Sequence, residues 1–211
     1  MSTGTLAQGA YERIKADVLA GRFAPNTILS ERDLAENLGI SRTPLRSALS
    51  RLEREGVIDR MANGALLVRP VTVELLLEIL QLRQILEPSA AARSAQFGIT
   101  EELLASREDM LRYLGDAKAT FQDFWRDDEK FHRAVSVAAR LELLPELLAE
   151  QRAIVQRSTI IRAHDNFADQ AREHLAVIDA IEEGDPGKAR AAMSLHFDNM
   201  RARTLGSLAN H

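Results

Sequence analysis

Three histidines and one aspartate in the second half of this 211-residue chain have the residue types and spacing of metal ligands. Asp128 and His132 are four residues apart, so their side chains meet on one face of a helix, and His174 and His196 each occupy the apolar side of another predicted helix. Burying all four without partners is unfavourable, whereas a divalent cation such as Zn²⁺, Ni²⁺, Fe²⁺ or Mn²⁺ satisfies them together. The same spacing also fits three separate core histidines with local hydrogen bonds, and spacing alone leaves both interpretations open.

An arginine on another helix of the same region has the chemistry of carboxylate binding. Arg83 lies on an inward helix, next to Leu82 and Leu86 in the chain, and a guanidinium binds a carboxylate through two parallel hydrogen bonds. We therefore expect Arg83 to bind a small carboxylate effector next to the metal. The alternative is a structural salt bridge with Glu87, four residues later in the chain.

Residues near the N-terminus have the chemistry of DNA recognition, namely Arg32, Ser41, Arg42, Thr43 and Arg46. Arginine can donate two hydrogen bonds to the O6 and N7 edge of guanine, and short hydroxyl side chains reach phosphates. The start of a helix also favours a nearby phosphate. Asn63 and Gly64 suit a hairpin tip that approaches the minor groove or the DNA backbone. Solvated surface charges and a plain hairpin turn are the alternatives.

The elements that must position these N-terminal residues follow the order of a winged helix-turn-helix over residues 1–70. A helix over 7–21 ends at Gly21, a second runs from 30 to 39, and a third runs from Ser41 to about Glu55. Ser30 with Asp33 resembles a capping box. Two short strands over 57–60 and 66–69 then pair across Asn63-Gly64, residue types that tolerate positive φ.

Residues 71–211 predict an all-helical antiparallel bundle, so the fold class is mainly α, with room for a site between the helices. The expected helices cover 72–96, 101–118, 121–139, 142–163, 167–183 and 186–206. Gly184-Asp185-Pro186 ends one helix and caps the next. Pro88 lies inside the first of these helices and should kink it.

The composition limits the class of protein. The net charge is −4, yet residues 1–70 hold 10 basic against 8 acidic side chains, and the remaining chain holds 17 against 23. A basic N-terminal part joined to an acidic remainder fits a DNA-binding protein. Cysteine is absent, which excludes disulfides and thiolate metal sites. We see neither an apolar run of about 18 residues nor a secretory signal, so we expect a cytoplasmic protein without a membrane span.

The N-terminal region closely resembles the GntR superfamily of bacterial regulators. The most specific stretch is Ser41-Arg42-Thr43-Pro44-Leu45-Arg46, supported by Leu29-Ser30-Glu31-Arg32-Asp33-Leu34-Ala35 and Leu38-Gly39-Ile40. Asn26, Ser47 and the turn Asn63-Gly64-Ala65 depart from the family pattern. The resemblance implies a homodimer that reads a short palindromic operator in double-stranded DNA, with Arg32, Arg42 and Arg46 as base or phosphate contacts.

Residues 72–208 resemble the FCD effector domain of the FadR subfamily, and six helices suit its VanR-like group. The matching pieces include Leu82-Arg83 with Glu87, Asp128-Glu129-Lys130-Phe131-His132, Glu173-His174, Gly184-Asp185 and His196. The resemblance implies that Asp128, His132, His174 and His196 hold the metal, and it supports the position of Arg83.

Together these features predict a ligand-responsive transcription regulator, a repressor by family habit, that senses a small organic acid at a metal-containing pocket. One alternative is a metal-dependent hydrolase or lyase in which His132, His174 and His196 hold a catalytic ion. No HExxH run accompanies these residues, and an enzyme leaves the DNA-reading module unexplained. Another alternative is an architectural DNA binder that has no ligand. We therefore expect a protein that is not an enzyme.

Overall fold

In a computed structural model of the protein, the chain separates into two units, Met1–Val71 and Thr72–His211. The structure describes residues 3–115, 119–158, 161 and 166–209. Each unit has its own core and is considered separately.

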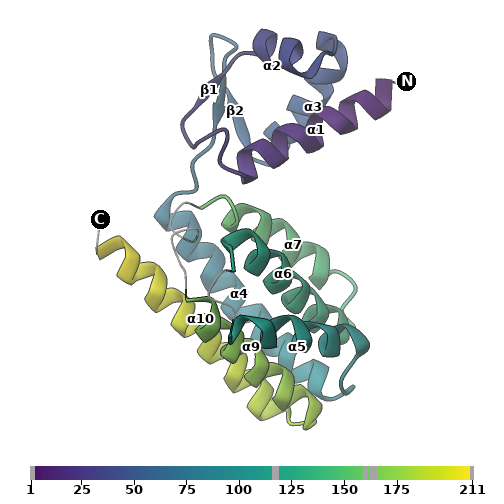
Figure 1. Cartoon of the computed structure of the whole chain (residues 1–211), viewed down its shortest axis with the longest axis vertical. Coiled ribbons are helices and arrows are strands. Elements are labelled where there is room, and N and C mark those ends of the chain that lie inside the picture. The colour runs from purple at the N-terminus through teal and green to yellow at the C-terminus, as the bar shows by residue number, and fades with distance from the viewer. Residues whose placement is uncertain (1–2, 116–118, 159–160, 162–165, 210–211) are drawn as a thin grey trace. The chain divides into compact units, whose positions relative to one another are not determined.

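The first unit combines three helices with a small antiparallel sheet (Figure 1). Its elements are α1 (Thr3–Leu19), β1 (Ile28–Leu29), α2 (Glu31–Leu38), α3 (Arg42–Arg54), β2 (Ile58–Arg60) and β3 (Leu66–Val68). The strand order is β1-β3-β2, with Ile58 opposite Val68. The core is an apolar cluster from α1, α3 and the sheet that includes Ile14, Leu45, Leu49, Leu52, Ile58 and Leu66. These elements confirm the predicted winged helix-turn-helix.

The turn between α2 and α3 forms where the sequence predicts it. The Ser30 hydroxyl accepts a hydrogen bond from the Asp33 backbone N–H at 3.4 Å, as in a capping box. Gly39 ends α2 in the left-handed conformation at φ 63°, where a side chain would be strained. Ser41 is the N-cap of α3, but its hydroxyl makes no capping hydrogen bond.

The tip of the hairpin differs from the sequence expectation. Only Gly64 has a positive φ, of 83°, because Asn63 uses its side chain instead and accepts a hydrogen bond from the Ala65 N–H at 3.0 Å. The Met61 N–H donates to the Ala65 carbonyl at 2.8 Å, which closes a loop longer than a two-residue turn. The β1 strand pairs with β3 and adds a third strand to the predicted hairpin.

The second unit is helical throughout its described residues (Figure 1). Its helices are α4 (Val73–Ala95), α5 (Glu101–Tyr113), α6 (Phe121–Ala138), α7 (Leu144–Val155), α9 (Phe167–Glu182) and α10 (Pro186–Ala209). The yellow α10 packs along α4 and α9, while α5 packs on α6 and α9, and α6 packs on α4 and α7. None of the helices in the described ranges has the length and apolar character that a bilayer span requires.

Most helix boundaries follow the predicted signals. Thr72, Thr100 and Thr120 each accept a hydrogen bond from a backbone N–H in the first turn of their helices. Asp185 does the same for α10, with Pro186 at its first position. The helix predicted over 101–118 ends at Tyr113, because Gly115 follows in a turn and glycine disfavours helix. Residues 116–118 of that prediction lie outside the described residues.

One further helix differs from the prediction. The helix expected over 142–163 begins at Leu144, with Pro145 in its first turn, and ends at Val155. Residues 159–160 and 162–163 of that expectation lie outside the described residues. The α4 helix agrees with the predicted range 72–96 to within one residue at each end and contains Pro88, and the kink at Pro88 stays a prediction.

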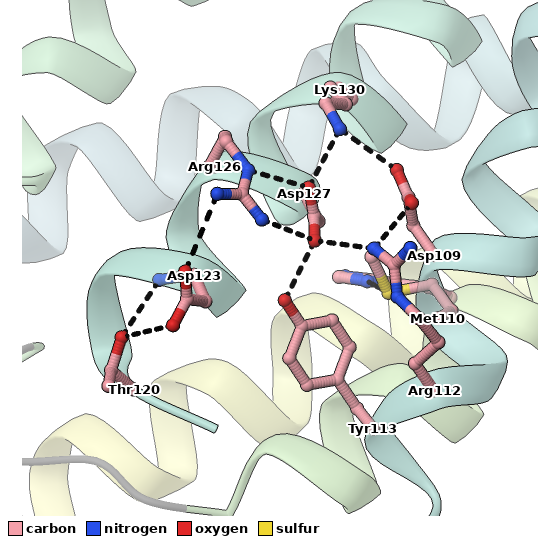
Figure 2. Close-up of polar contacts among 10 residues, drawn as sticks. Asp109, Met110, Arg112, Tyr113, Thr120, Asp123, Arg126, Asp127 and Lys130 are labelled. Atoms are coloured by element: carbon pink, nitrogen blue, oxygen red, sulfur yellow. Dashed lines mark hydrogen bonds and ion pairs between the residues drawn. The ribbon is translucent and has the colours of Figure 1, made fainter. Parts of the chain in front are cut away.

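A buried carboxylate fixes α6 against α5 (Figure 2). Asp127 accepts hydrogen bonds from the Tyr113 hydroxyl at 2.8 Å, from Lys130 Nζ at 2.8 Å and from Arg126 Nε at 3.1 Å. Arg112 adds an ion pair to Asp127 at 3.1 Å. Because Asp127 precedes Asp128 in the chain, this cluster also sets the position of a predicted metal ligand.

Candidate metal centre and nucleic-acid interface

Three histidines from three helices meet in the core of the second unit. His132 lies on α6, His174 on α9 and His196 on α10, and each is at most 1% exposed. One ring nitrogen of each lies within 4.8 Å of the others. The ring centroids are 4.6 Å apart for His174 and His196, and 5.3 Å apart for His132 and His174. This convergence is what a shared cation requires of its ligands.

Asp128 adds an oxygen to the three nitrogens. Its Oδ1 lies 3.4 Å from His174 Nε2 and 3.6 Å from His132 Nε2. Neither Asp128 Oδ1 nor the Nε2 atom of any of the three histidines has a hydrogen-bond partner among the described residues. Buried polar atoms without partners are rare in proteins and point to an ion or a water. The structure therefore brings all four predicted ligands together, and their free donor atoms fit a divalent metal.

The second nitrogen of each ring is held by a different partner. His132 Nδ1 contacts Glu87, His196 Nδ1 contacts Glu173 Oε2 at 2.8 Å, and His174 Nδ1 contacts Met110 Sδ at 3.2 Å. These acceptors favour the tautomer with hydrogen on Nδ1, which leaves the Nε2 lone pair free to bind metal.

The charges around the centre keep its ligands in metal-binding form. Burial raises the pKa of Asp128, but Arg152, whose Nη2 lies 2.5 Å from Oδ2, and His132 outweigh burial and hold this pKa well below 3.8. Burial and the neighbouring His196 lower the pKa of His174 well below 6.5. Burial also lowers the pKa of His196, against the opposing effect of Glu173. Near neutral pH Asp128 is thus a carboxylate, and His174 and His196 are neutral imidazoles.

Arg83 is fully buried on α4 and lies beside this centre. Its Nε donates to Glu87 Oε1 at 2.6 Å, so the predicted alternative contact with Glu87 exists. Its Nη2 has no hydrogen-bond partner in the described ranges. Arg83 and Asp128 both line a cavity of about 20 Å³. The arginine therefore holds one carboxylate and keeps a donor free.

The predicted DNA-contacting residues lie at the surface of the first unit. Exposed side chains include Arg32, Ser41, Arg42, Thr43, Arg46 and Asn63, and Gly64 is exposed as well. Arg42 has no ion-pair partner among the residues that the structure describes. Glu31 pairs with Arg46 of α3 at 3.2 Å and with Arg60 of β2 at 2.5 Å, so one carboxylate ties the helix to the wing.

Sequence reasoning missed several residues of both sites. Arg152, Glu173 and Met110 support the metal ligands, and Glu31 with Arg60 supports the DNA-facing surface. Glu173 directly precedes His174 in the chain, which is a weak sign of its role. The others depend on how separate helices and strands align with one another, and no local spacing encodes that alignment.

Comparisons with known proteins agree with this arrangement. A family model described as bacterial regulatory proteins, gntR family, matches residues 6–68, and one described as FCD domain matches residues 78–199. The Nta operon transcriptional regulator of Aminobacter aminovorans is 29% identical over 185 residues, which cover 84% of this chain and 86% of that protein. The transcriptional repressor RspR of Escherichia coli K12 is 24% identical over 203 residues, covering 94% and 88%.

A solved structure has the same fold. The E. coli protein McbR/YncC superposes with a TM-score of 0.76 at 20% identity, covering 99% of both chains. The similarity in fold therefore covers the elements of the first unit and those of the second.

Proposed function

We propose that this chain, which belongs to the gntR family of bacterial regulatory proteins and carries an FCD domain, represses transcription until a small carboxylate binds beside a metal ion. Like its curated relatives, it is a transcriptional regulator and not an enzyme. The alternative of a metal-dependent hydrolase or lyase is not supported, because the same histidines belong to a regulator's FCD domain. Repression is proposed because RspR, a relative of matching length, bears the name repressor.

The DNA-binding part of this proposal rests on the start of α3. Arg42, Thr43 and Arg46 lie in the first turns of that helix and are exposed. A recognition helix enters the major groove with its N-terminal residues against the base edges. Arg42 and Arg46 then contact bases or phosphates, with Arg32 on the adjoining helix and the Asn63-Gly64 tip at the flanking backbone.

The sensing part rests on the four unpaired donor atoms of the metal centre, which is the observation that carries the proposal. Asp128, His132, His174 and His196 hold Zn²⁺, Ni²⁺, Fe²⁺ or Mn²⁺, since this donor set selects poorly among first-row ions. Four protein ligands leave coordination positions open for an effector carboxylate. Arg83 Nη2 then donates a hydrogen bond to the same carboxylate.

The regulator is proposed to act as a cytoplasmic homodimer on a short palindromic operator. Leu82 and Ile85 are exposed on one side of α4, and Leu195 is exposed on α10, which packs along α4. An exposed apolar surface of this kind is typically covered by a partner. An effector can change DNA binding only through its different affinity for the two arrangements of the dimer.

DNA recognition is tested with Arg42→Ala, because Arg42 has no ion-pair partner in the described part of the chain and its loss breaks no folding contact. Duplexes selected from a random pool serve as the operator, and binding is followed by fluorescence anisotropy. We expect affinity to fall by about 1–3 kcal/mol for a base contact. Arg54→Ala, at the other end of α3, is the matched control. Equal affinity for the selected duplex in both variants would contradict the assignment.

Metal binding and assembly are tested on the same preparation. His132→Ala should lower metal content measured by mass spectrometry, and full occupancy would remove His132 from the ligand set. Sedimentation should give twice the chain mass of 23.4 kDa. A monomer at micromolar concentration would contradict the homodimer. Absence of any thermal response to small acids would favour an architectural DNA binder.

A further inference from the structure

We infer that the effector is a monocarboxylic acid with a flat aromatic body, an inference that rests on the proposed function and specifies its ligand. The evidence is the lining of the cavity beside Asp128. Arg83 and Asp128, a predicted ligand of the metal centre, are the charged residues of this lining. Most of the other walls are apolar, so the two ends of a ligand meet different chemistry.

The apolar end of the cavity is built mainly from aromatic rings. Phe121, Phe124 and Trp125 come from α6, and Phe167 comes from the start of α9. Gln170, on the next turn of α9, and the indole N–H of Trp125, which has no hydrogen-bond partner among the described residues, are the further polar groups of the lining. A sugar acid carries more hydroxyls than these two groups can satisfy, and a buried hydroxyl without a partner is unfavourable.

The polar end of the cavity suits one carboxylate. Arg83 is held by Glu87 through Nε, and its guanidinium lies 5.0 Å from the Phe197 ring centroid, so its free Nη2 is fixed in place. Arg152, the other buried arginine nearby, pairs with Asp128 at 2.5 Å and is not part of the described lining. Arg83 is the one cation of that lining, so a second carboxylate finds no cation there, which argues against dicarboxylic acids.

The rings around the cavity are already arranged in parallel pairs. Phe124 and Phe167 stack at 4.9 Å with an interplanar angle of 21°, and Phe121 and Trp125 stack at 5.7 Å with an angle of 26°. A flat aromatic ligand that enters between two such rings stacks on both of them, so two stacking contacts take the place of one. A branched aliphatic ligand cannot stack in this way. The parallel faces therefore favour an aromatic guest.

The cavity must widen to admit that ring. Its volume of about 20 Å³ is enough for about one water. Phe121 and Phe167 are each the first residue of their helix and only half-buried, whereas Phe124 and Trp125 are buried. Phe121 and Phe167 are thus the most exposed of the four aromatic wall residues, and we expect the cavity to widen on their side when the ligand enters.

The experiment compares acids on the full-length protein loaded with Zn²⁺. Benzoate and phenylacetate are matched against acetate, succinate and gluconate at equal concentration, with thermal shift and release of the selected duplex as readouts. We expect an aromatic acid to give the largest shift and to weaken DNA binding, while succinate and gluconate give none. A response to succinate or gluconate equal to that of benzoate overturns the aromatic class and leaves the proposed function standing.

Two other outcomes are also decisive. If the protein binds Zn²⁺ and DNA yet responds to none of the acids, the aromatic inference is overturned. If it binds neither Zn²⁺ nor DNA, the proposed function fails, and this inference fails with it. Zn²⁺ content and duplex affinity are measured first, so the two failures are distinguishable.

A pair of variants locates the aromatic body in the cavity. Phe167→Leu removes the ring that stacks on Phe124, and we expect the ratio of benzoate to acetate affinity to fall about tenfold. General damage to the fold or to the metal centre lowers the affinity for both acids, so it does not change the ratio of benzoate to acetate affinity. Phe97→Leu is the control, because Phe97 is 40% exposed and contacts Arg140 instead of the cavity. An unchanged ratio in Phe167→Leu, or an equal fall in Phe97→Leu, overturns the assignment.

Discussion

Glu173→Gln tests whether the carboxylate behind His196 supports metal binding. Glu173 Oε2 contacts His196 Nδ1 at 2.8 Å and so orients the ring with Nε2 toward the centre. The same carboxylate accepts hydrogen bonds from Asn199 at 2.8 Å and from Arg203 at 2.7 Å. Glutamine keeps the size of the side chain and removes its charge. The amide can also present its NH₂ group to His196 and favour the wrong tautomer.

The expected loss follows from the pKa of the carboxylate. Burial raises the pKa of Glu173, but hydrogen bonds from His196 and Arg203 outweigh it and lower the pKa to about 2 from the usual 4.5. This difference favours the charged form by about 3 kcal/mol. Part of this difference comes from the His196 contact, and we expect its loss to weaken metal binding about tenfold. The value lies at the lower end of the roughly 10–100-fold range typical of residues behind metal ligands.

Competition between the protein and a chromogenic chelator for Zn²⁺ measures this loss. Glu182→Gln is the matched control, because Glu182 lies on the same helix and pairs with Arg107 at 2.7 Å, away from the histidines. We expect the control to bind Zn²⁺ like the unmodified protein. A Glu173→Gln variant within about twofold of the unmodified protein would refute the reasoning, as would an equal loss in Glu182→Gln.

Three further predictions concern stability, DNA selectivity and pH. Tyr113→Phe removes one hydrogen bond to the charged Asp127 and should lower the free energy of unfolding by about 1–2 kcal/mol, or the melting temperature by about 2–6 °C in calorimetry. Glu31→Gln frees Arg46 from its ion pair and should reduce the ratio of specific to non-specific duplex affinity; an unchanged ratio would contradict this role. Burial and the neighbouring His196 lower the pKa of His174 below 6.5, so below that pH the unfolded chain binds more protons than the fold. Urea melts of the metal-free protein should therefore show stability falling from pH 7 to pH 5, and a flat profile would contradict the buried neutral imidazole.

Local patterns were enough to predict much of the fold. The Ser30 cap, the left-handed Gly39 and the Gly184-Asp185-Pro186 boundary all act within a few residues of the chain, so sequence alone placed them correctly. The end of α5 at Tyr113 was predicted too late, at residue 118, because the break signal at Gly115 to Thr120 spans several residues and does not fix the last helical one. At the hairpin tip, Asn63 satisfies the turn with its side chain and not with a positive φ, a choice that residue type does not determine.

The candidate site was predictable only where spacing within one helix decided the geometry. Asp128 and His132 share a face because they are four residues apart. The approach of His174 to Asp128 depends on the register between α6 and α9, which the family resemblance supplied and periodicity did not. Arg152 is a clearer case, since only the packing of α7 on α6 brings it to Asp128.

The charges around the metal centre connect metal binding to effector binding. Three carboxylates are each paired with one arginine, and the pairs are Asp128 with Arg152, Glu87 with Arg83, and Glu173 with Arg203. Each pair joins one negative charge to one positive charge, so the three pairs are balanced before a metal binds. A divalent cation then adds two positive charges that these pairs do not neutralise, in a buried place where charge is poorly screened.

An anion entering the cavity compensates part of that excess charge, so metal and effector should each strengthen the binding of the other. We expect benzoate to bind more tightly to the Zn²⁺-loaded protein than to the metal-free protein, and Zn²⁺ to bind more tightly by the same factor when benzoate is present. Calorimetric titrations in both orders measure the two factors. Equal benzoate affinity with and without Zn²⁺ would mean that the carboxylate binds to Arg83 alone and that the metal has only a structural role.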